Sequence, residues 1–144
     1  LKGAKIIYCY RNPLDHITEI YTKYFEKQHT YSSSITESAN LWIATHTLMN
    51  EYKKQFSDHI YFLNYDDLVR DTENTTKSLI EWLGWRYSEI YLNPAFDPTT
   101  YICPNNNQQR INKSFLNTHI NYLDILEPAI YAFKKHKEFK SFVE

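Results

Sequence analysis

The fold of this chain is decided at residues 5–15, which read Lys5-Ile6-Ile7-Tyr8-Cys9-Tyr10-Arg11-Asn12-Pro13-Leu14-Asp15. The residues before Arg11 are mostly β-branched or aromatic, which predicts a buried strand. Asn12 is a good helix N-cap, and Pro13 follows at the first helical position, where a missing N–H costs nothing. Asp15 lies in the first turn, where a carboxylate suits the helix dipole. We therefore predict a strand that runs directly into a helix, with Arg11 at the junction.

The rest of the chain alternates helix and strand signals in an α/β pattern that is rich in helix. We expect a first helix that ends near Gln28 and a long helix opened by the capping box Ser34-Ile35-Thr36-Glu37. A second buried strand follows at residues 59–64, and then a helix that Thr72 caps and Gly84 ends. A loop at 93–107 precedes a last helix at about 122–137. The residues expected on the buried helix faces are Leu14, Ile17, Tyr21, Tyr24, Leu41, Thr45, Leu48, Tyr52, Thr76, Leu79, Ile80, Leu83, Ile125, Ala129, Ala132 and Phe133.

Composition excludes several function classes. The 144 residues carry 16 Lys+Arg against 17 Asp+Glu, so the chain lacks the basic field of a nucleic-acid-binding protein. No apolar run approaches the roughly 20 residues of a transmembrane segment. Two glycines are too few for a phosphate-binding P-loop, which excludes autonomous ATPase or GTPase activity. Cys9 and Cys103 form neither a disulfide scaffold nor a zinc motif, so we expect a cytoplasmic protein.

The N-terminus and the strand count predict an incomplete domain. The chain begins with Leu1, has its one methionine at Met49 and shows no signal-peptide pattern. Two strands are few for an α/β sheet, so we interpret residues 1–144 as a single partial domain from a longer protein. The exposed edge of such a sheet would favour self-association.

Arg11 is the candidate for anion binding. It stands where a strand ends and a capped helix begins, the place where open α/β sheets bind ligands. Only four arginines occur beside twelve lysines, and the planar guanidinium suits bidentate contact with phosphate. The alternative is that Arg11 pairs with a local acid such as Asp15. The residue types alone favour neither interpretation.

Two blocks of this sequence resemble the sulfotransferases that use 3′-phosphoadenosine 5′-phosphosulfate (PAPS). Residues 5–15 look like the strand–RNP-x-D–helix segment of that family, and residues 60–71 resemble its YEDL…D strand and turn. The spacing between the blocks also fits, and residues 111–130 are similar to bacterial members fused to tetratricopeptide repeats. The resemblance implies a P-loop NTPase-like sulfotransferase fold, truncated at its N-terminus.

The resemblance implies roles for individual residues. Arg11 would bind the 3′-phosphate of the nucleotide, and Tyr65 would line the adenine pocket unless it only packs in the core. The family has a serine phosphate ligand eight residues after the arginine, where this chain has Glu19, whose carboxylate would repel phosphate. The adjacent Thr18 points about 100° away on a helix and would substitute only if the turn shifted.

The later family elements are degenerate here. Gln108 stands where the family has a second arginine for the 3′-phosphate, and Arg110, two residues further on, could compensate. The family's Gly-Gly-Trp is replaced by Asn117-Thr118-His119. The 5′-phosphosulfate loop and the catalytic base precede the RNP segment in the family and are absent from residues 1–144. We therefore assign no catalytic residue and expect this chain to be inactive by itself.

Other constellations favour structural roles. His16 and Glu19 are spaced like two metal ligands but lack a third, so we interpret them as a surface pair. Asp66-Asp67 follows a strand, where paired acids cap a turn and anchor a loop. His46 is expected on a polar helix face, and Cys9 in the core.

The sequence leaves two functions open. The first is the 3′-phosphate-binding part of a sulfotransferase that transfers a sulfonate from PAPS to a hydroxyl acceptor on a carbohydrate or peptide. The second is a non-catalytic interaction module that keeps the fold but has lost the cofactor site, which Glu19 and Gln108 favour.

Overall fold

The computed structural model describes residues 3–22, 30–92 and 113–143. Its elements, in chain order, are β1 (Ile6–Tyr10), α1 (Pro13–Thr22), η1 (Thr30–Ser33), α2 (Ile35–Gln55), β2 (Ile60–Asn64), α3 (Tyr65–Arg70), α4 (Thr72–Leu83), η2 (Glu89–Leu92), η4 (Lys113–Phe115), η5 (Thr118–Tyr122), α5 (Leu123–Lys134) and η6 (Lys137–Phe142). The η elements are short 3₁₀ helices. The expected loop at 93–107 and the expected end of the first helix near Gln28 lie outside the described residues.

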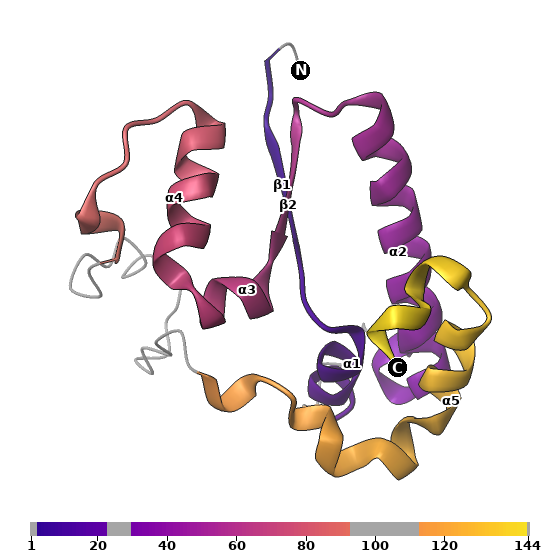
Figure 1. Ribbon diagram of the computed structural model, residues 1–144. Helices are drawn as coiled ribbons and strands as arrows, with labels where there is room; N and C mark the ends of the chain where they lie inside the picture. Colours follow the sequence, from indigo (N-terminus) through magenta and orange to yellow (C-terminus); the bar gives the residue numbers. More distant parts are fainter. Residues whose placement is uncertain (1–2, 23–29, 93–112, 144) are drawn as a thin grey trace.

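A parallel two-stranded sheet stands at the centre of the described chain (Figure 1). β1 pairs with β2 so that Ile6 lies opposite Ile60 and Tyr10 opposite Asn64. Successive side chains of β2 face opposite sides of the sheet. The Tyr61 ring contacts Trp82 of α4, and the Phe62 ring contacts His46 of α2. Helices thus cover both sides of the sheet, and the α/β prediction is confirmed.

The first strand is less buried than the sequence predicted. Ile6, Ile7 and Cys9 are all exposed, so the expectation that Cys9 is a core residue was wrong. The apolar composition of residues 4–10 identified the strand correctly but not its surroundings. Each strand has one strand neighbour in the described chain, which leaves one edge of β1 without a partner strand.

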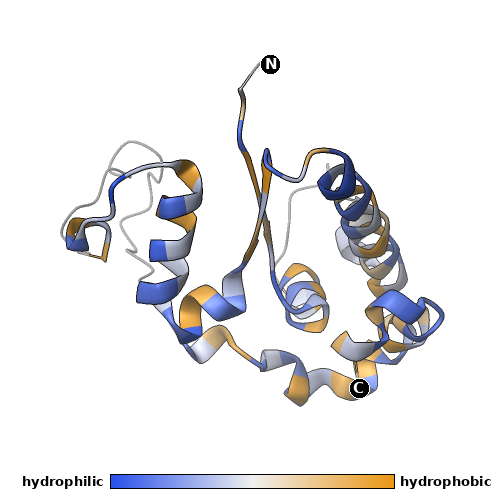
Figure 2. Ribbon diagram, turned by 45° about the horizontal axis from the view of Figure 1, so that its top comes forward, coloured by the Kyte–Doolittle hydropathy of each residue, from blue (hydrophilic) through white to orange (hydrophobic). Residues whose placement is uncertain are grey.

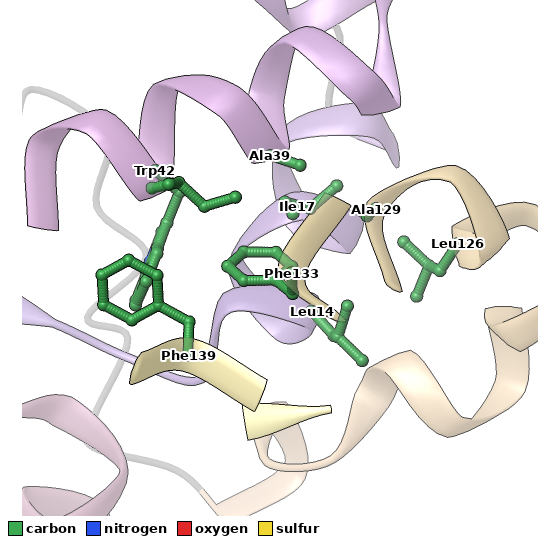
Figure 3. Close-up of a cluster of buried hydrophobic side chains, with 9 residues drawn as sticks. Leu14, Ile17, Ala39, Trp42, Leu126, Ala129, Phe133 and Phe139 are labelled. Atoms are coloured by element: carbon green, nitrogen blue, oxygen red, sulfur yellow. The ribbon is translucent and has the colours of Figure 1, made fainter. Parts of the chain in front are cut away.

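The core lies beside the sheet, where α1, α2, α5 and η6 meet (Figure 3). Two buried phenylalanines, Phe133 of α5 and Phe139 of η6, pack against the Trp42 ring with centroids 5.4 and 5.6 Å away. The other buried members are Leu14, Ile17, Ala39, Ile43, Leu126 and Ala129. The C-terminal part of the chain therefore packs directly against the helix that follows β1.

The buried face of α2 differs from the predicted one. Leu41, Leu48 and Tyr52 were expected inside and are 43–50% exposed. The buried stripe instead passes through Ala39, Trp42, Ile43 and His46. Hydrophobic and hydrophilic residues are mixed along α2 (Figure 2). Both sets of residues have helical spacing, so the spacing alone does not decide which set is buried.

His46 was expected on a polar face, and this prediction was wrong. Only 5% of the residue is exposed. Its ring stacks on Trp42 at 4.5 Å, and its Nδ1 atom lies 3.3 Å from the Tyr8 hydroxyl. His46 thereby joins β1, α2 and η6 in one aromatic cluster, because its ring also contacts Phe139.

Most helix boundaries follow the predicted caps. The Ser34 side chain accepts a hydrogen bond from the Glu37 N–H, as the capping box requires, and Gly84 ends α4 in the left-handed conformation. The N-cap of α4 is Asp71 and not Thr72, because the Asp71 carboxylate accepts from the N–H of Asn74. The hydroxyl of Thr72 instead donates to Leu68 in the preceding turn, which forms the short helix α3.

Two other predicted faces are correct only in part. Leu14 and Ile17 of α1 are buried, whereas Tyr21 is exposed and Tyr24 lies outside the described residues. In α5, Leu126 is buried in place of Ile125. In the described ranges, no helix combines the length and apolar character needed to cross a bilayer.

We predict that His46 makes the stability of the fold sensitive to acid. Burial lowers the pKa of His46 below 6.5, against a smaller opposite effect of Glu138. The unfolded chain takes up this proton at about pH 6.5, whereas the folded chain resists it. The free energy of unfolding should therefore stay at its full value above about pH 6.5 and decrease as the pH falls below it. Burial also lowers the pKa of His16, which acts in the same direction.

Urea unfolding of wild type and His46→Phe at about pH 5.5 and 7.5 tests this prediction. The variant should lose less stability on acidification than wild type does. His136→Gln, at an exposed position, is the control and should retain the wild-type loss. An equal loss in wild type and His46→Phe would contradict the prediction.

Candidate functional site

The candidate site lies where both parallel strands end. Asn12, just after β1, donates its N–H to the Asp66 carboxylate just after β2, at 2.6 Å. The Asn12 side chain also caps α1, since its Oδ1 atom accepts from the N–H groups of Leu14 and Asp15 at 2.9 and 3.2 Å. Asn64 caps α3 in the same way, by accepting from the Asp66 N–H at 2.9 Å. The capping chemistry of the two loops thus brings both strand ends together.

Arg11 occupies the centre of this site and is only 8% exposed. Its Nη1 atom donates to the Glu19 carboxylate at 2.6 Å, and its Nη2 atom donates to the backbone carbonyl of Phe115 at 2.6 Å. The Asp15 carboxylate lies 3.6 Å from Nη2. The guanidinium thus contacts both α1 and the C-terminal segment. The pairing of Arg11 with local acids, one of the two interpretations of the sequence, is present.

The third side of the guanidinium faces Asp66 and Tyr65. Nε of Arg11 and Oδ1 of Asp66 are 4.0 Å apart, and neither atom has a hydrogen-bond partner although both are buried. The Tyr65 ring lies 5.4 Å from the guanidinium carbon, within cation–π range. The expected anchoring role of Asp66 is confirmed by its hydrogen bond from the backbone of Asn12.

Asp15 holds the C-terminal segment against α1. Its carboxylate is 1% exposed and accepts from the Asn117 N–H, the Thr118 hydroxyl and the His119 N–H at 2.8, 3.1 and 2.9 Å. Nδ1 of His119 lies 2.7 Å from the same carboxylate. Burial alone would raise the pKa of Asp15, but the hydrogen bonds from His119 and Asn117 bring it below its ordinary value.

The charges of the site limit which ligands it can take. One guanidinium faces three carboxylates, those of Asp15, Glu19 and Asp66. Two of these are buried and hydrogen-bonded, whereas 36% of the Glu19 side chain is exposed. An anion would bind well at Nη1 only after Glu19 turns toward water, because the Glu19 carboxylate lies 2.6 Å from this atom and repels other negative charge. The described residues thus fit a phosphate group when Glu19 is displaced.

The candidate residues from the sequence are only partly brought together. Arg11, Glu19 and Tyr65 meet at the site. Thr18 does not join them, since it is buried and its hydroxyl donates to the Leu14 carbonyl at 2.8 Å. Gln108 and Arg110 lie outside the described residues.

The sequence analysis missed three features of the site. These are the hydrogen bonds by which Asp15 holds the C-terminal segment, the Phe115 carbonyl that accepts from Arg11, and the contact of His119 with Asp15. Asp15 carried a signal, because a carboxylate in the first turn after a strand stands at the ligand edge of the sheet. His119 was noted only as part of the segment that replaces Gly-Gly-Trp, and Phe115 carried no signal, because the place of both depends on contacts across about a hundred residues.

His16 and Glu19 are spaced in the sequence like two metal ligands. No cluster of three His, Cys, Asp or Glu side chains suited to a metal ion occurs among residues 3–22, 30–92 and 113–143. Glu19, which was expected to form a surface pair with His16, accepts a hydrogen bond from Arg11. Burial lowers the pKa of His16, Arg11 lowers it further, and Glu19 opposes both.

Comparison with known families agrees with this geometry. Residues 1–89 match the Sulfotransferase family. The chain belongs to this family. No curated protein and no solved structure matches the chain. The family match includes the Arg11 junction and the β2–α3 turn but ends before residues 113–143, so the contact between Asp15 and the C-terminal segment is known from the structure alone.

We predict that Asp15→Asn loosens the C-terminal segment. An amide keeps one acceptor oxygen but turns an NH₂ group toward donors, so at least one buried N–H loses its partner. The free energy of unfolding should fall by about 1.5–3 kcal/mol, the range for hydrogen bonds to a charged group. The measurement is urea unfolding followed by tyrosine and tryptophan fluorescence.

Asp67→Asn is the matched control, because the Asp67 side chain is 62% exposed and its ion pair in the described ranges is with exposed Arg70. It should change the free energy of unfolding by less than about 1 kcal/mol. Equal effects of the two variants would show that the Asp15 contacts do not stabilise the fold.

Proposed function

We propose that this chain carries the 3′-phosphate-binding part of a sulfotransferase that moves a sulfonate from PAPS to a hydroxyl group. Membership of the Sulfotransferase family supports sulfonate transfer as the reaction class. The observation that carries the proposal is the position of Arg11, at the carboxyl end of a parallel strand and beside the capped N-terminus of α1. The sequence resemblance gives PAPS as the cofactor, with a carbohydrate or peptide as the acceptor.

Arg11 would bind the 3′-phosphate through Nη1. A guanidinium in a mostly buried site makes strong charge-assisted hydrogen bonds, because little water competes for it. In the structure, the Nη1 atom of Arg11 donates to the Glu19 carboxylate, which would have to give way to the phosphate. The Glu19 side chain is 36% exposed, so it has room to turn toward solvent. The Tyr65 ring is half-buried next to the same guanidinium, which suits it to line the adenine pocket. Gln108 or Arg110 would assist from the preceding segment.

The described residues support binding and not transfer. PAPS supplies the sulfonate, and a complete enzyme must also hold the 5′-phosphosulfate group and position a base for the acceptor hydroxyl. We assign neither function to a residue of this chain. We also infer a P-loop-like α/β domain, which the parallel strands with helices on both sides support. The cysteine content of the sequence is the reason to propose a cytoplasmic enzyme.

We predict that Arg11→Ala weakens binding of 3′-phosphoadenosine 5′-phosphate by about 1.5–3 kcal/mol, the range for a hydrogen bond to a charged group. Titration calorimetry with this nucleotide and with adenosine 5′-phosphate, which lacks the 3′-phosphate, measures the effect. The loss should be confined to the 3′-phosphorylated ligand.

Arg70→Ala is the matched control, because Arg70 is exposed and, among the residues that the structure describes, forms its ion pair with exposed Asp67. Arg11→Lys keeps a charge against the buried carboxylates and serves if Arg11→Ala does not fold. Unchanged affinity for 3′-phosphoadenosine 5′-phosphate in the folded Arg11 variants would refute the assignment of Arg11.

The second candidate function is a non-catalytic interaction module with the sulfotransferase fold. The bond of 2.6 Å between Arg11 and Glu19 favours it, because the carboxylate replaces an anionic ligand. We predict that Glu19→Ser increases affinity for 3′-phosphoadenosine 5′-phosphate by roughly tenfold, or about 1.4 kcal/mol. Glu51→Ser, on exposed α2 surface, is the control. No nucleotide binding by either wild type or Glu19→Ser would favour the interaction module.

Self-association through the edge of β1 is a further part of the proposal. The edge opposite β2 has no partner strand in the described chain, and Ile6 and Ile7 are exposed there. Unpaired edges with apolar side chains favour pairing with another copy. Sedimentation should show dimers that increase with concentration and decrease in Ile7→Lys. A wild-type chain that stays monomeric at all concentrations would contradict this.

A further inference from the structure

We propose that Asp66 is a positioning residue for the phosphate site, and that the Arg11 guanidinium has two positions, one held by Glu19 and the other by Asp66. This inference rests on the proposed function, in which the phosphate of a nucleoside 3′-phosphate displaces Glu19. When the phosphate takes Nη1 of Arg11, the Nε–H of Arg11 closes onto Oδ1 of Asp66. Asp66 itself touches no atom of the ligand.

Two buried polar atoms of the site have no hydrogen-bond partner among the residues that the structure describes. They are Nε of Arg11, which is a donor, and Oδ1 of Asp66, which is an acceptor. The two atoms lie 4.0 Å apart, which is too far for a hydrogen bond. Buried groups left without partners cost free energy. A state in which these two atoms pair is therefore favoured once nothing holds them apart.

The other contacts of the guanidinium explain why the pair is open. Nη1 of Arg11 donates to Glu19 and Nη2 donates to the Phe115 carbonyl, both at 2.6 Å. Because the guanidinium is planar and rigid, these two short bonds also determine where Nε lies. Departure of Glu19 removes one of the two restraints. Nε then has to approach Oδ1 of Asp66 from 4.0 Å to about 2.8 Å to form a charge-assisted hydrogen bond.

Asp66 is the stationary member of the pair. Its Oδ2 atom accepts from the Asn12 N–H at 2.6 Å, and its own N–H donates to the Asn64 side chain at 2.9 Å. The residue is only 3% exposed, and these bonds attach it to the ends of both strands. Arg11 is therefore the residue that moves, and Asp66 determines where its guanidinium comes to rest.

The positioning role and a simple charge effect of Asp66 have opposite consequences. A negative charge that only lay nearby would repel the phosphate, so its removal would strengthen binding. In Asp66→Asn, the amide oxygen stays with the Asn12 N–H, and the NH₂ group faces the Nε–H of Arg11. Two donors cannot bond to each other. The guanidinium then lacks its second position, and removal of the charge weakens binding.

The first test is calorimetric titration of the whole chain with 3′-phosphoadenosine 5′-phosphate and with adenosine 5′-phosphate. We expect Asp66→Asn to lower affinity for the first nucleotide about tenfold and to leave the second unchanged. The matched control is Asp67→Asn, which removes the same charge from a neighbouring side chain that is 62% exposed, and it should change neither affinity. An affinity that rises or stays equal in Asp66→Asn, or that falls equally for both nucleotides, overturns the positioning role.

The second test needs neither a nucleotide nor a variant of Asp66. The chain has four arginines, so an NMR spectrum contains few Nε–H signals, and the Arg11 signal is the one that is absent from Arg11→Lys. In Glu19→Ser, this signal should shift downfield and its proton should exchange with solvent more slowly than in wild type. Glu51→Ser, on exposed α2 surface, is the control and should leave the signal unchanged.

The two tests distinguish failure of this inference from failure of the proposed function. If wild type prefers the 3′-phosphorylated nucleotide but the Arg11 signal is the same in Glu19→Ser as in wild type, the second position of Arg11 is overturned and the proposed function stands. If the signal responds but wild type shows no preference between the nucleotides, the proposed function fails, and the role of Asp66 in nucleotide binding fails with it.

Discussion

A buried guanidinium is the constraint on which the described structure depends. Arg11 cannot lose its water without compensating charge, and that requirement is met by Asp15 and Glu19 from α1 and by Asp66 from the turn after β2. Asp66 lies on α3, far along the chain from Asp15 and Glu19 of α1. Their convergence therefore fixes the register at which both strand ends, the first helix and the C-terminal segment meet.

The same interactions connect stability with the proposed chemistry. Asp15 and Asp66 are occupied by backbone N–H groups of the segment 117–119 and of Asn12, so they cannot move without opening the fold. Glu19 is the exception, because its exposed side chain contributes charge at the rim. Glu19 can therefore leave Arg11 without any loss of the buried contacts of Asp15 and Asp66 that hold the fold together. In the proposed function, a phosphate would replace Glu19 while the buried carboxylates kept the guanidinium oriented.

The sequence predicted the elements better than their surroundings. Local signals such as Asn12-Pro13, the Ser34 capping box and Gly84 located helix ends correctly, because caps depend on neighbouring residues. The buried stripe of α2 and the exposure of Cys9 were missed, since both depend on which elements cover a face. Arg11 and Tyr65 were located by motif. His119 could not be, because only the folded chain brings it to Asp15.

The central claim is that Arg11 exchanges Glu19 for the 3′-phosphate of a nucleotide. A crystal structure of this chain with 3′-phosphoadenosine 5′-phosphate tests it most directly. The account predicts a 3′-phosphate oxygen within hydrogen-bond distance of the Arg11 Nη1 atom, at about 2.7–2.9 Å, and a Glu19 side chain turned into solvent. A nucleotide bound elsewhere, with the Arg11–Glu19 pair intact, would contradict it.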